Sequence, residues 1–465
     1  MNRIRIPADL VKVNDIFKKN GYKAYLVGGA VRDILRKKEG HDWDLATNAT
    51  PEQVMKIFHR VIPTGIAHGT VTIHIFGHDI ETTTFRTESS YSDGRHPDKV
   101  AYAATIEEDL SRRDFTINAI AADLESGDLI DPYDGQEDIK KKIIRTVGSP
   151  LERFDEDGLR PVRAIRFAGQ LGFEIEEATL KAISEPAVLK KTASVSVERF
   201  RDEWCKMLLT DNPGASLRLL EETGILDIFI PEFKACRRCM QHDARGFHDF
   251  DVADHLFHAC DGATKESLIV RLAAFFHDIG KPDVRSTEIK DGVELIHFHK
   301  HEVISEKKCR TIMTRLKFPN ETINRVCHLV REHMFYYEKS WSDSTVRRFI
   351  IRVGYENFDD LIELRIADIY GMHAVPLVDN SPTFMLLAEL RTRVEKCQES
   401  NSAMSIKDLA INGNDLMELN IPAGKALGAI LRELFEAVTD SPEMNERGKL
   451  IECAKKIWTT KYCPD

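Results

Sequence analysis

Two acidic residues, Asp42 and Asp44, stand one residue apart in the segment HDWDLAT. If this segment is a β-strand, both carboxylates face one side, while Trp43 and Leu45 face the other. Two carboxylates on one face repel each other unless a cation lies between them. The same pattern also occurs at solvated strand ends, so the neighbouring residues must decide between a metal site and a surface.

A glycine pair and an arginine precede the two acids in LVGGAVRD, residues 26–33. We expect a strand, a turn at Gly28 and Gly29, and a helix N-terminus, where backbone N–H groups and Arg32 can bind a phosphate. A phosphate-binding turn followed by an acid pair indicates metal-assisted nucleotidyl transfer with Mg²⁺. In that chemistry the cations activate a hydroxyl group and stabilise the pyrophosphate leaving group.

A two-metal site usually includes a third carboxylate, and two residues qualify. Glu81 lies in DIETTTF, on the second strand of an expected hairpin, and Asp114 follows two arginines in SRRDFTINA. Asp114 could equally form an ordinary salt bridge with Arg112 or Arg113. The sequence leaves the choice between Glu81 and Asp114 open.

Charged residues recur at helical spacing in EDGLRPVRAIR, at Asp157, Arg160, Arg163 and Arg166, and the three arginines recur every third residue along one face. A carboxylate accepts an N–H from the exocyclic amine of cytosine or adenine, while an arginine donates to the adjacent ring nitrogen. Uracil and guanine present a carbonyl where the carboxylate needs a donor, so one Asp–Arg pair could select C and A. A surface helix with paired charges would show the same spacing.

A second group of candidate ligands lies farther along the chain. His277 and Asp278 end the apolar stretch LIVRLAAFFHD, where a buried charged pair needs partners. Other expected helices carry His255, His301, His333 and Asp368. Imidazoles and carboxylates that converge in a helical bundle form a divalent-metal site suited to phosphate-ester hydrolysis. Any single one of these histidines could instead be a core residue.

The composition is that of a protein with several domains, with 465 residues, 42% hydrophobic residues and a formal net charge of −10. This charge argues against a protein coated in nucleic acid but allows a local basic track. No apolar run approaches the roughly 18 residues of a membrane span, and the first residues are too charged for a signal peptide. Nine scattered cysteines favour reduced thiols. We therefore expect a cytoplasmic protein without a membrane partner.

The elements that must position these residues change in type near residue 150. Before it, strand and helix signals alternate: TPEQ at residues 50–53 predicts a capped helix start, and GTVTIHIFGHDIETTTF predicts a hairpin turning at Gly77 and His78. After it, the apolar spacing is helical almost throughout, with breaks near residues 212, 291 and 380. The fold class is therefore predicted as α+β, with an α+β head on a long helical body.

The motifs from about residue 20 to residue 230 resemble the bacterial class II tRNA nucleotidyltransferases, that is, the CCA-adding enzymes and the related poly(A) polymerases. The resemblance rests on LVGGAVRD, DWDLATNATPEQV, ETTTFRTESSYSDGRHPDKV, EEDLSRRDFTINAIA and RFDEDGLRPVRAIRFAGQLGF. It implies a small mixed-sheet head, with Mg²⁺ ligands Asp42 and Asp44. It also implies that the nucleotide is bound by Gly29, Arg32, Arg113, Asp157, Arg160, Arg163 and Arg166.

Residues 91–100, YSDGRHPDKV, are rich in turn-forming and charged residues and are expected to form a mobile loop. In the resembled family, a flexible loop with an arginine like Arg95 is needed to switch from C to A addition. Enzymes of that family that add only CC lack the loop. Its presence therefore argues against a CC-only enzyme.

Residues 250–370 resemble the HD phosphohydrolase domain that several bacterial tRNA nucleotidyltransferases carry. The resemblance implies a divalent metal of unspecified identity on His255, His277, Asp278 and Asp368, with His301 and His333 as additional ligands. That family acts on cyclic phosphates, 2′-nucleotides and other phosphoesters. The segment from about residue 375 resembles the body and tail that grip the tRNA elbow.

We therefore expect a nucleotidyltransferase head at 1–148, a helical neck for base selection and RNA binding at 149–240, an HD domain at 241–374 and a helical tRNA-binding body and tail at 375–465. The expected function is template-independent addition of CCA to tRNA from CTP and ATP, and the sequence leaves open whether the HD domain adds a phosphohydrolase activity. The alternatives are an A-adding enzyme, a poly(A) polymerase or, in a different class, an HD phosphohydrolase whose head binds RNA.

Overall fold

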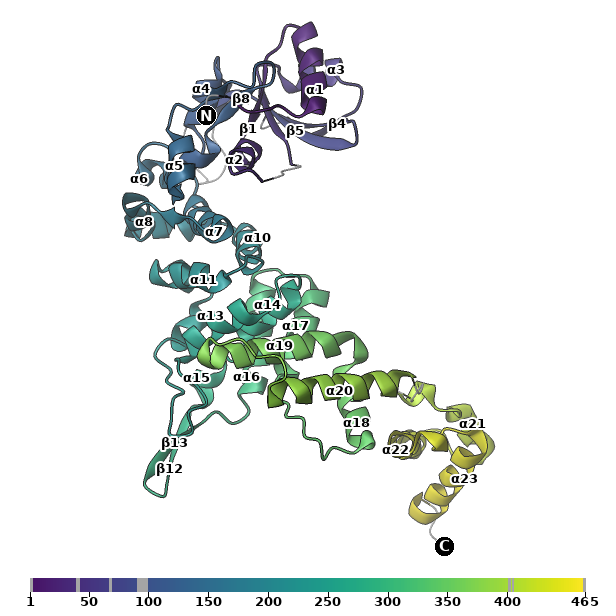
Figure 1. Ribbon diagram of the computed structural model, residues 1–465. Helices are drawn as coiled ribbons and strands as arrows, with labels where there is room; N and C mark the ends of the chain where they lie inside the picture. Colours follow the sequence, from purple (N-terminus) through teal and green to yellow (C-terminus); the bar gives the residue numbers. More distant parts are fainter. Residues whose placement is uncertain are drawn as a thin grey trace. The chain divides into compact units, whose positions relative to one another are not determined.

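The computed structural model describes residues 3–38, 42–66, 69–89, 99–399, 403 and 405–462. The chain divides into two compact units: Met1–Lys234 with Arg315–Lys317, and Ala235–Thr314 with Phe318–Asp465 (Figure 1). The first unit holds the mixed sheet and a set of helices, and the second is almost entirely helical. The α+β class expected from the sequence is therefore confirmed. No helix in the described ranges is both long enough and apolar enough to span a membrane.

The head is built on a seven-stranded sheet in the order β3-β4-β5-β2-β1-β8-β9. The strands are β1 (Ala24–Val27), β2 (Asp44–Thr47), β3 (Val61–Gly65), β4 (Thr70–Ile75), β5 (His78–Thr84), β8 (Ala121–Asp123) and β9 (Leu129–Ile130). Only the central β2–β5 pair is parallel, and the other neighbours are antiparallel. The long connection from β2 to β5 therefore brings two distant segments side by side at the centre of the sheet.

Two boundaries in the head differ from the expectation. The strand with the acid pair begins at Asp44, so Asp42 and Trp43 precede it. The predicted hairpin between β4 and β5 is confirmed, but it turns at Phe76 and Gly77, one residue early, because Ile75 pairs with His78. Phe76 and Gly77 have φ values of 54° and 81°, the left-handed geometry of a two-residue hairpin turn.

Helices and a short strand pair complete the head. They are α1 (Ala8–Lys19), α2 (Gly29–Leu35), α3 (Pro51–Ile57), α4 (Ile106–Ser111), α5 (Gly135–Lys141), β6 (Arg86–Ser89) and β7 (Lys99–Tyr102). The predicted start of α3 is confirmed, with Thr50 as N-cap and Gln53 completing the capping box. An apolar cluster that includes Tyr25, Ala46 and Leu110 packs strands of the sheet against α4. Arg95 and the rest of residues 90–98 lie outside the described residues.

Seven helices follow the head within the first unit. They are α6 (Pro150–Glu156), α7 (Arg160–Leu171), α8 (Glu177–Ile183), α9 (Pro186–Thr192), α10 (Val197–Leu208), α11 (Pro213–Glu222) and α12 (Ile225–Phe229). A short parallel pair, β10 (Ile143–Ile144) and β11 (Glu174–Ile175), joins the end of the head to this region. Pro161 lies in the first turn of α7, where no intrahelical amide bond is lost.

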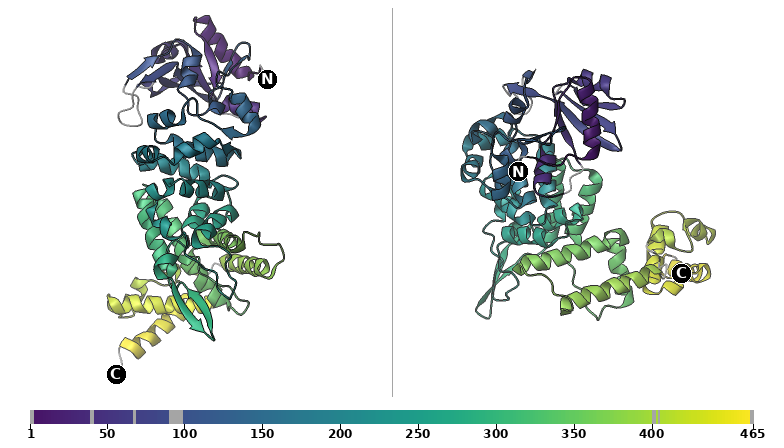
Figure 2. Two further views of the ribbon diagram at one scale, coloured as in Figure 1. Left: turned by 90° about the vertical axis from the view of Figure 1, so that its left-hand side faces the viewer. Right: turned by 45° about the horizontal axis from the view of Figure 1, so that its top comes forward.

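The second unit contains α13 (Val252–Gly262), α14 (Leu268–Phe276), α15 (Lys281–Val284), α16 (His301–Arg315), α17 (Asn320–Glu332), α18 (Asp343–Val353), α19 (Tyr355–His373), α20 (Pro382–Glu399), α21 (Gly413–Glu418), α22 (Lys425–Asp440) and α23 (Arg447–Ile457). Its hairpin, β12 (Ser286–Lys290) and β13 (Val293–His297), projects from the helices (Figure 2). The expected break at residue 291 is the turn of this hairpin. Helix α19 packs closely on α13 at Gly371. A Cβ at this position would lie only 2.9 Å from the His255 ring, so glycine allows the close approach.

Candidate functional site

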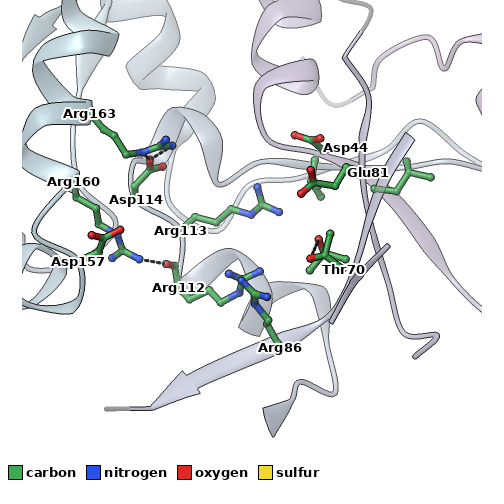
Figure 3. Close-up of a pocket in the computed structure, with 13 residues that line it drawn as sticks. Asp44, Thr70, Glu81, Arg86, Arg112, Arg113, Asp114, Asp157, Arg160 and Arg163 are labelled. Carbon is green, nitrogen blue, oxygen red and sulfur yellow. Dashed lines mark hydrogen bonds and ion pairs between the residues drawn. The ribbon is translucent and has the colours of Figure 1, made fainter. Parts of the chain in front are cut away.

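The first unit contains a pocket of about 320 Å³ that many of the sequence-predicted residues line. Strands of the head supply one wall, and the start of α7 supplies the opposite wall (Figure 3). Its charged lining consists of Asp44, Glu81, Arg86, Arg112, Arg113, Asp114, Asp157, Arg160 and Arg163. Five arginines and four acids in one pocket suit a ligand that carries both phosphates and a metal ion.

Asp44 and Glu81 form the acidic end of this pocket. They are register partners on the parallel strands β2 and β5, and their side chains lie side by side (Figure 3). Asp42 is exposed just before β2 and is not one of the lining residues. Although solvent reaches Asp44, partial desolvation and then the negative charge of Glu81 raise its pKa to about 6. Asp42 contributes to this rise, whereas Arg113 opposes it.

This donor set fits a hard divalent cation. Carboxylate oxygens are the protein ligands that Mg²⁺ prefers. The raised pKa of Asp44 reflects desolvation first and then the nearby charge of Glu81, and a bound cation would favour the ionised carboxylate against both effects. Arg113, the cation that opposes the rise, is itself paired with Asp109 at 3.2 Å. The acids at this end of the pocket therefore have the chemistry of a magnesium site.

Asp114, the other candidate third acid, has a different environment. Its Oδ2 accepts N–H bonds from Arg163 at 2.7 and 2.9 Å, and its Oδ1 accepts from Asn118 at 3.1 Å. Burial alone would raise the pKa of Asp114, but the charges of Arg163 and Arg160 outweigh it and hold the pKa at about 2. Asp114 thus forms a salt bridge, although with Arg163 rather than with Arg112 or Arg113. Glu81 is the candidate that the structure brings beside Asp44.

The glycine turn lies directly against the acids. Gly28 has a φ of 68°, and a Cβ there would lie 3.2 Å from Nη1 of Arg113 and 3.5 Å from Oδ2 of Asp44. Gly29, the glycine expected to contact the nucleotide, is the first residue of α2. A positive φ and the close approach make Gly28 the position that requires glycine. The sequence indicates this role of Gly28 by placing the glycine between an expected strand and an expected helix start.

Arg32 does not line the pocket. Its buried guanidinium donates to Asn118 Oδ1 at 2.8 Å and pairs with Asp33 at 3.0 Å. It also lies over the Phe167 ring, with 5.3 Å between the guanidinium carbon and the ring centroid. These contacts tie α2 to the segment after α4 and to α7. The structure thus gives Arg32 protein partners, and its contact with a nucleotide stays a prediction.

Two arginines at the pocket were missing from the sequence prediction as nucleotide ligands. Arg112 pairs with the buried Asp109 at 2.7 Å, and Arg86 is the first residue of β6 and lies near Arg112 (Figure 3). Burial would raise the pKa of Asp109, but Arg112 and Arg113 lower it overall. Asp109 therefore acts as an anchor for both consecutive arginines. The doubled arginine of SRRDF was a visible signal, whereas the position of Arg86 depends on strand pairing.

The arginines of α7 do not share one face. Arg160 donates to the backbone oxygens of Arg153 at 3.1 Å and Arg112 at 3.0 Å and also pairs with Glu156. Arg166 is buried, pairs with Glu203 and does not line the pocket. With about 3.6 residues per turn, a spacing of three drifts, so Arg166 points roughly 120° away from Arg160. The expectation that all three arginines lie along one face is therefore wrong for Arg166.

The six candidate ligands of the second unit converge. His255, His277, Asp278 and Asp368 form one group whose ligand atoms all lie within 4.8 Å, and Asp278, His301 and His333 form another. All six side chains are buried. The Nε2 atom of His255 lies 3.1 Å from Asp278 and 3.4 Å from Asp368, and that of His301 lies 3.0 Å from Asp278. Asp278 is therefore shared by the two groups.

The histidine rings are oriented as metal ligands usually are. The Nδ1 atoms of His277, His301 and His333 lie 2.9, 2.8 and 2.7 Å from backbone carbonyl oxygens three residues earlier. An N–H donated there leaves the Nε2 lone pair facing the cluster. Burial lowers the pKa of His277, but Asp278 and Asp368 raise it to about 10. A proton on His277 thus balances the carboxylates, and a divalent cation could take its place.

A cavity of about 490 Å³ opens beside this cluster. It is lined by cluster members and by basic residues that include Arg245, Lys281 and Arg365. Lys281 is buried, with its Nζ 2.5 Å from Asp278 and 2.6 Å from the side-chain oxygen of Gln241. A metal-ligand cluster next to a basic cavity suits an anionic ligand such as a phosphoester.

Comparisons with known proteins match both units. The chain matches the family models described as "Poly A polymerase head domain" at residues 24–145, "Probable RNA and SrmB- binding site of polymerase A" at residues 172–237 and "tRNA nucleotidyltransferase domain 2 putative" at residues 295–454. The last model spans part of the segment expected to be an HD domain, so that assignment stays a prediction.

Two curated relatives are similar over nearly their whole length. The CCA-adding enzyme of Lactiplantibacillus plantarum is 33% identical over 442 residues, which are 95% of this chain and 94% of the relative. The CCA-adding enzyme of Enterococcus faecalis is 34% identical over 441 residues, with coverages of 94% and 92%. The crystal structure of the Bacillus stearothermophilus CCA-adding enzyme in complex with CTP matches with a TM-score of 0.72 at 28% identity, over 96% of each chain. The similarity therefore runs through both units.

Proposed function

This chain belongs to the CCA-adding enzymes, a family of tRNA nucleotidyltransferases, and we propose that its head pocket adds C, C and A to tRNA 3′ ends from CTP and ATP. One observation carries the proposal. The same pocket holds Asp44 and Glu81, which suit the reaction, and Asp157 and Arg160, which suit base selection. A nucleotide that spans the pocket would place its phosphates near the acids and its base near α7.

In the proposed reaction, the terminal hydroxyl of the tRNA attacks the α-phosphorus of the bound nucleotide. A new P–O bond forms and the bond to pyrophosphate breaks, so each step lengthens the RNA by one residue. Asp42, Asp44 and Glu81 would hold Mg²⁺, which when bound activates the hydroxyl and neutralises developing charge. Arg113 is anchored by Asp109 and points toward the acids, where it can contact the phosphates (Figure 3).

Base selection would use Asp157 and Arg160. The Asp157 carboxylate accepts the amine N–H of cytosine or adenine, and Arg160 donates to the neighbouring ring nitrogen. Because both readers belong to the protein, no nucleic-acid template is needed. Arg163, paired with Asp114, fixes the start of α7 relative to the acidic end of the pocket.

The rival functions within this class are A addition alone and poly(A) synthesis. Their head motifs resemble those of this chain, but relatives similar over both units are CCA-adding enzymes. We propose that Arg95 and its loop, which lie outside the described residues, support the change from C to A addition. The four-domain division and the cytoplasmic location stay predictions.

The role of the acids can be tested by single-turnover incorporation of CMP into tRNA that lacks CCA. We expect Asp44→Asn and Asp42→Asn to lose more than the roughly 10–100-fold that loss of an outer-shell partner costs. Asp79→Asn is the matched control, because Asp79 lies on β5 two residues from Glu81 and pairs with His74 at the surface. Full incorporation by Asp44→Asn would refute the proposed metal site.

We propose phosphoester hydrolysis as a second function, located in the second unit. The convergence of six buried metal-ligating side chains beside a basic cavity supports it. In this proposal His255, His277, Asp278 and Asp368 bind one divalent metal, and Asp278, His301 and His333 can bind another. The test is hydrolysis of a 2′,3′-cyclic nucleotide by the full chain with added Mn²⁺, Ni²⁺ or Co²⁺. Absence of hydrolysis with every metal would reject the second function.

A further inference from the structure

We propose that Arg199 is a positioning residue for nucleotide selection: it holds both carboxylate oxygens of Asp157 and leaves one acceptor position, on Oδ2, for the amine of the incoming base. The inference rests on the proposed function, in which Asp157 reads that amine. Arg199 lies in the first turn of α10 and is not one of the pocket-lining residues, so it would act through Asp157.

The backbone at Asp157 is fixed by a close approach. Asp157 directly follows α6, with φ −143° and ψ 112°, and Gly158 comes next. A Cβ on Gly158 would lie 2.5 Å from the backbone oxygen of Lys191, so only glycine fits without movement of the chain. The turn between α6 and α7 is therefore held against the end of α9, and the Asp157 side chain starts from a defined position.

The Asp157 carboxylate already accepts three N–H bonds. Its Oδ1 accepts from the backbone of Leu159 at 2.9 Å and from Nη1 of Arg199 at 3.1 Å. Its Oδ2 accepts from Nη2 of Arg199 at 2.7 Å. A carboxylate offers about two acceptor positions on each oxygen, so Oδ1 is filled and Oδ2 keeps one. The carboxylate is thus an oriented acceptor with a single open position.

The second reader, Arg160, has a partner of its own. Arg160 pairs with Glu156, whereas Asp157 pairs with Arg199. The two readers are therefore each held by a different residue, and neither has to turn away from the pocket to find a partner. Without the Arg199 fork, the Asp157 carboxylate could rotate about its last side-chain torsion and turn toward Arg160 instead. Both side chains would then be less available to a base.

The test compares nucleotide selectivity in Arg199→Gln and the wild-type enzyme. The measured quantities are kcat/KM for CTP against UTP on tRNA lacking CCA, and for ATP against GTP on tRNA ending in CC. We expect both ratios to fall at least about tenfold, because a well-placed base contact discriminates by that order. KM for the correct nucleotide should rise more than kcat falls, because the reacting groups are untouched.

Arg201→Gln is the matched control. Arg201 lies on the same helix, its side chain has the same 22% exposure as that of Arg199, and it pairs with Asp202 instead. Its selectivity ratios should equal those of the wild type. If Arg199→Gln does not fold, Arg199→Lys serves in its place, since lysine keeps the charge but cannot hold both oxygens as a fork. It should show an intermediate loss of selectivity.

A double variant separates the possible failures. If Arg199 acts through Asp157, adding Arg199→Gln to Asp157→Asn should lower selectivity no further. Should Asp157→Asn lose selectivity while Arg199→Gln or Arg199→Lys keeps it within about twofold, the positioning role is refuted and the proposed base reader survives. Should Asp157→Asn keep wild-type selectivity, the proposed reader itself is wrong, and the role of Arg199 falls with it.

Discussion

Asp44 on β2 and Glu81 on β5 are direct register partners in the only parallel strand pair of the head sheet. Register partners on adjacent strands carry their side chains on the same face at short range. Two carboxylates in that position are unfavourable without a cation, and desolvation together with the charge of Glu81 raises the pKa of Asp44 to about 6. The sheet thus creates an acidic site that neither strand could form alone.

The first prediction concerns the third carboxylate. Glu81→Gln should raise the Mg²⁺ concentration needed for half-maximal CMP incorporation, because one ligand of the cation loses its charge. Asp114→Asn should leave this concentration within about twofold of the wild type, because Asp114 is paired with Arg163. Magnesium titrations of incorporation rate measure both. The reverse pattern would make Asp114 the metal ligand.

The second prediction concerns stability in acid. The pKa of Asp114 is held at about 2 in the folded chain, against 3.8 for the ordinary group. A lowered pKa contributes stability that is present above about pH 4 and is lost as the pH falls through 2, and this shift corresponds to about 2 kcal/mol. Asp114→Asn should therefore lower the unfolding free energy at pH 7 and pH 5. Between pH 4 and pH 2, the unfolding free energy of this variant should depend less on pH than that of the wild type.

Chemical denaturation at several pH values measures this difference. Asp79→Asn, at an exposed position, is the control and should follow the wild type. If wild type and Asp114→Asn lose stability in parallel from pH 4 to pH 2, the pair with Arg163 does not hold the carboxylate in its ionised form.

The third prediction separates the two units. His277→Ala should abolish binding of a divalent metal in the second unit and any phosphoester hydrolysis, while CCA addition continues at the wild-type rate. Metal content after dialysis against Mn²⁺ and thermal unfolding with and without EDTA are the readouts. EDTA should lower the unfolding temperature of the wild type and not that of His277→Ala, because metal binding stabilises only the folded state.

His373→Ala is the control for that experiment. His373 ends α19, the helix that carries Asp368, but it pairs with Asp249 at the surface. It should keep wild-type metal content. Equal metal content in His277→Ala and the wild type would show that the cluster is a polar core rather than a metal centre.

The fourth prediction concerns Arg95. Arg95→Ala should add two cytidines at close to the wild-type rate and then add adenosine at least about tenfold more slowly, because the base readers are intact but the change to ATP is impaired. Sequencing of the tRNA 3′ ends over time measures the two steps. Equal slowing of C and A addition would assign Arg95 a general role.

Much of the site could be predicted from local sequence. Asp42, Asp44 and the glycine turn are recognisable because a phosphate-binding turn and an acid pair follow each other within a short segment. The six candidate ligands of the second unit were named from residue type and helical context, and the structure brings all six together. Helix starts such as Thr50 to Gln53 are equally local, since a capping box needs only neighbouring residues.

What could not be predicted depends on contacts between distant segments. The choice of Glu81 over Asp114 required the register of β5 against β2 and the Arg163 salt bridge. The three arginines of α7 were expected along one face, but the helical period turns Arg166 away from Arg160, and its pairing with Glu203 on α10 depends on the packing of two helices. The role proposed for Arg199 could not be predicted because its partner Asp157 lies in the turn between α6 and α7, and no local pattern links the two.

CCA addition by this chain can be tested by sequencing the products that the full chain forms with CTP and ATP on three RNAs. These are tRNA lacking CCA, tRNA ending in CC and an unstructured RNA of similar length. We expect that the first gains CCA, the second gains one A, and the third is not extended. Long A tails on the unstructured RNA, or extension of only the CC-ending tRNA, would contradict it.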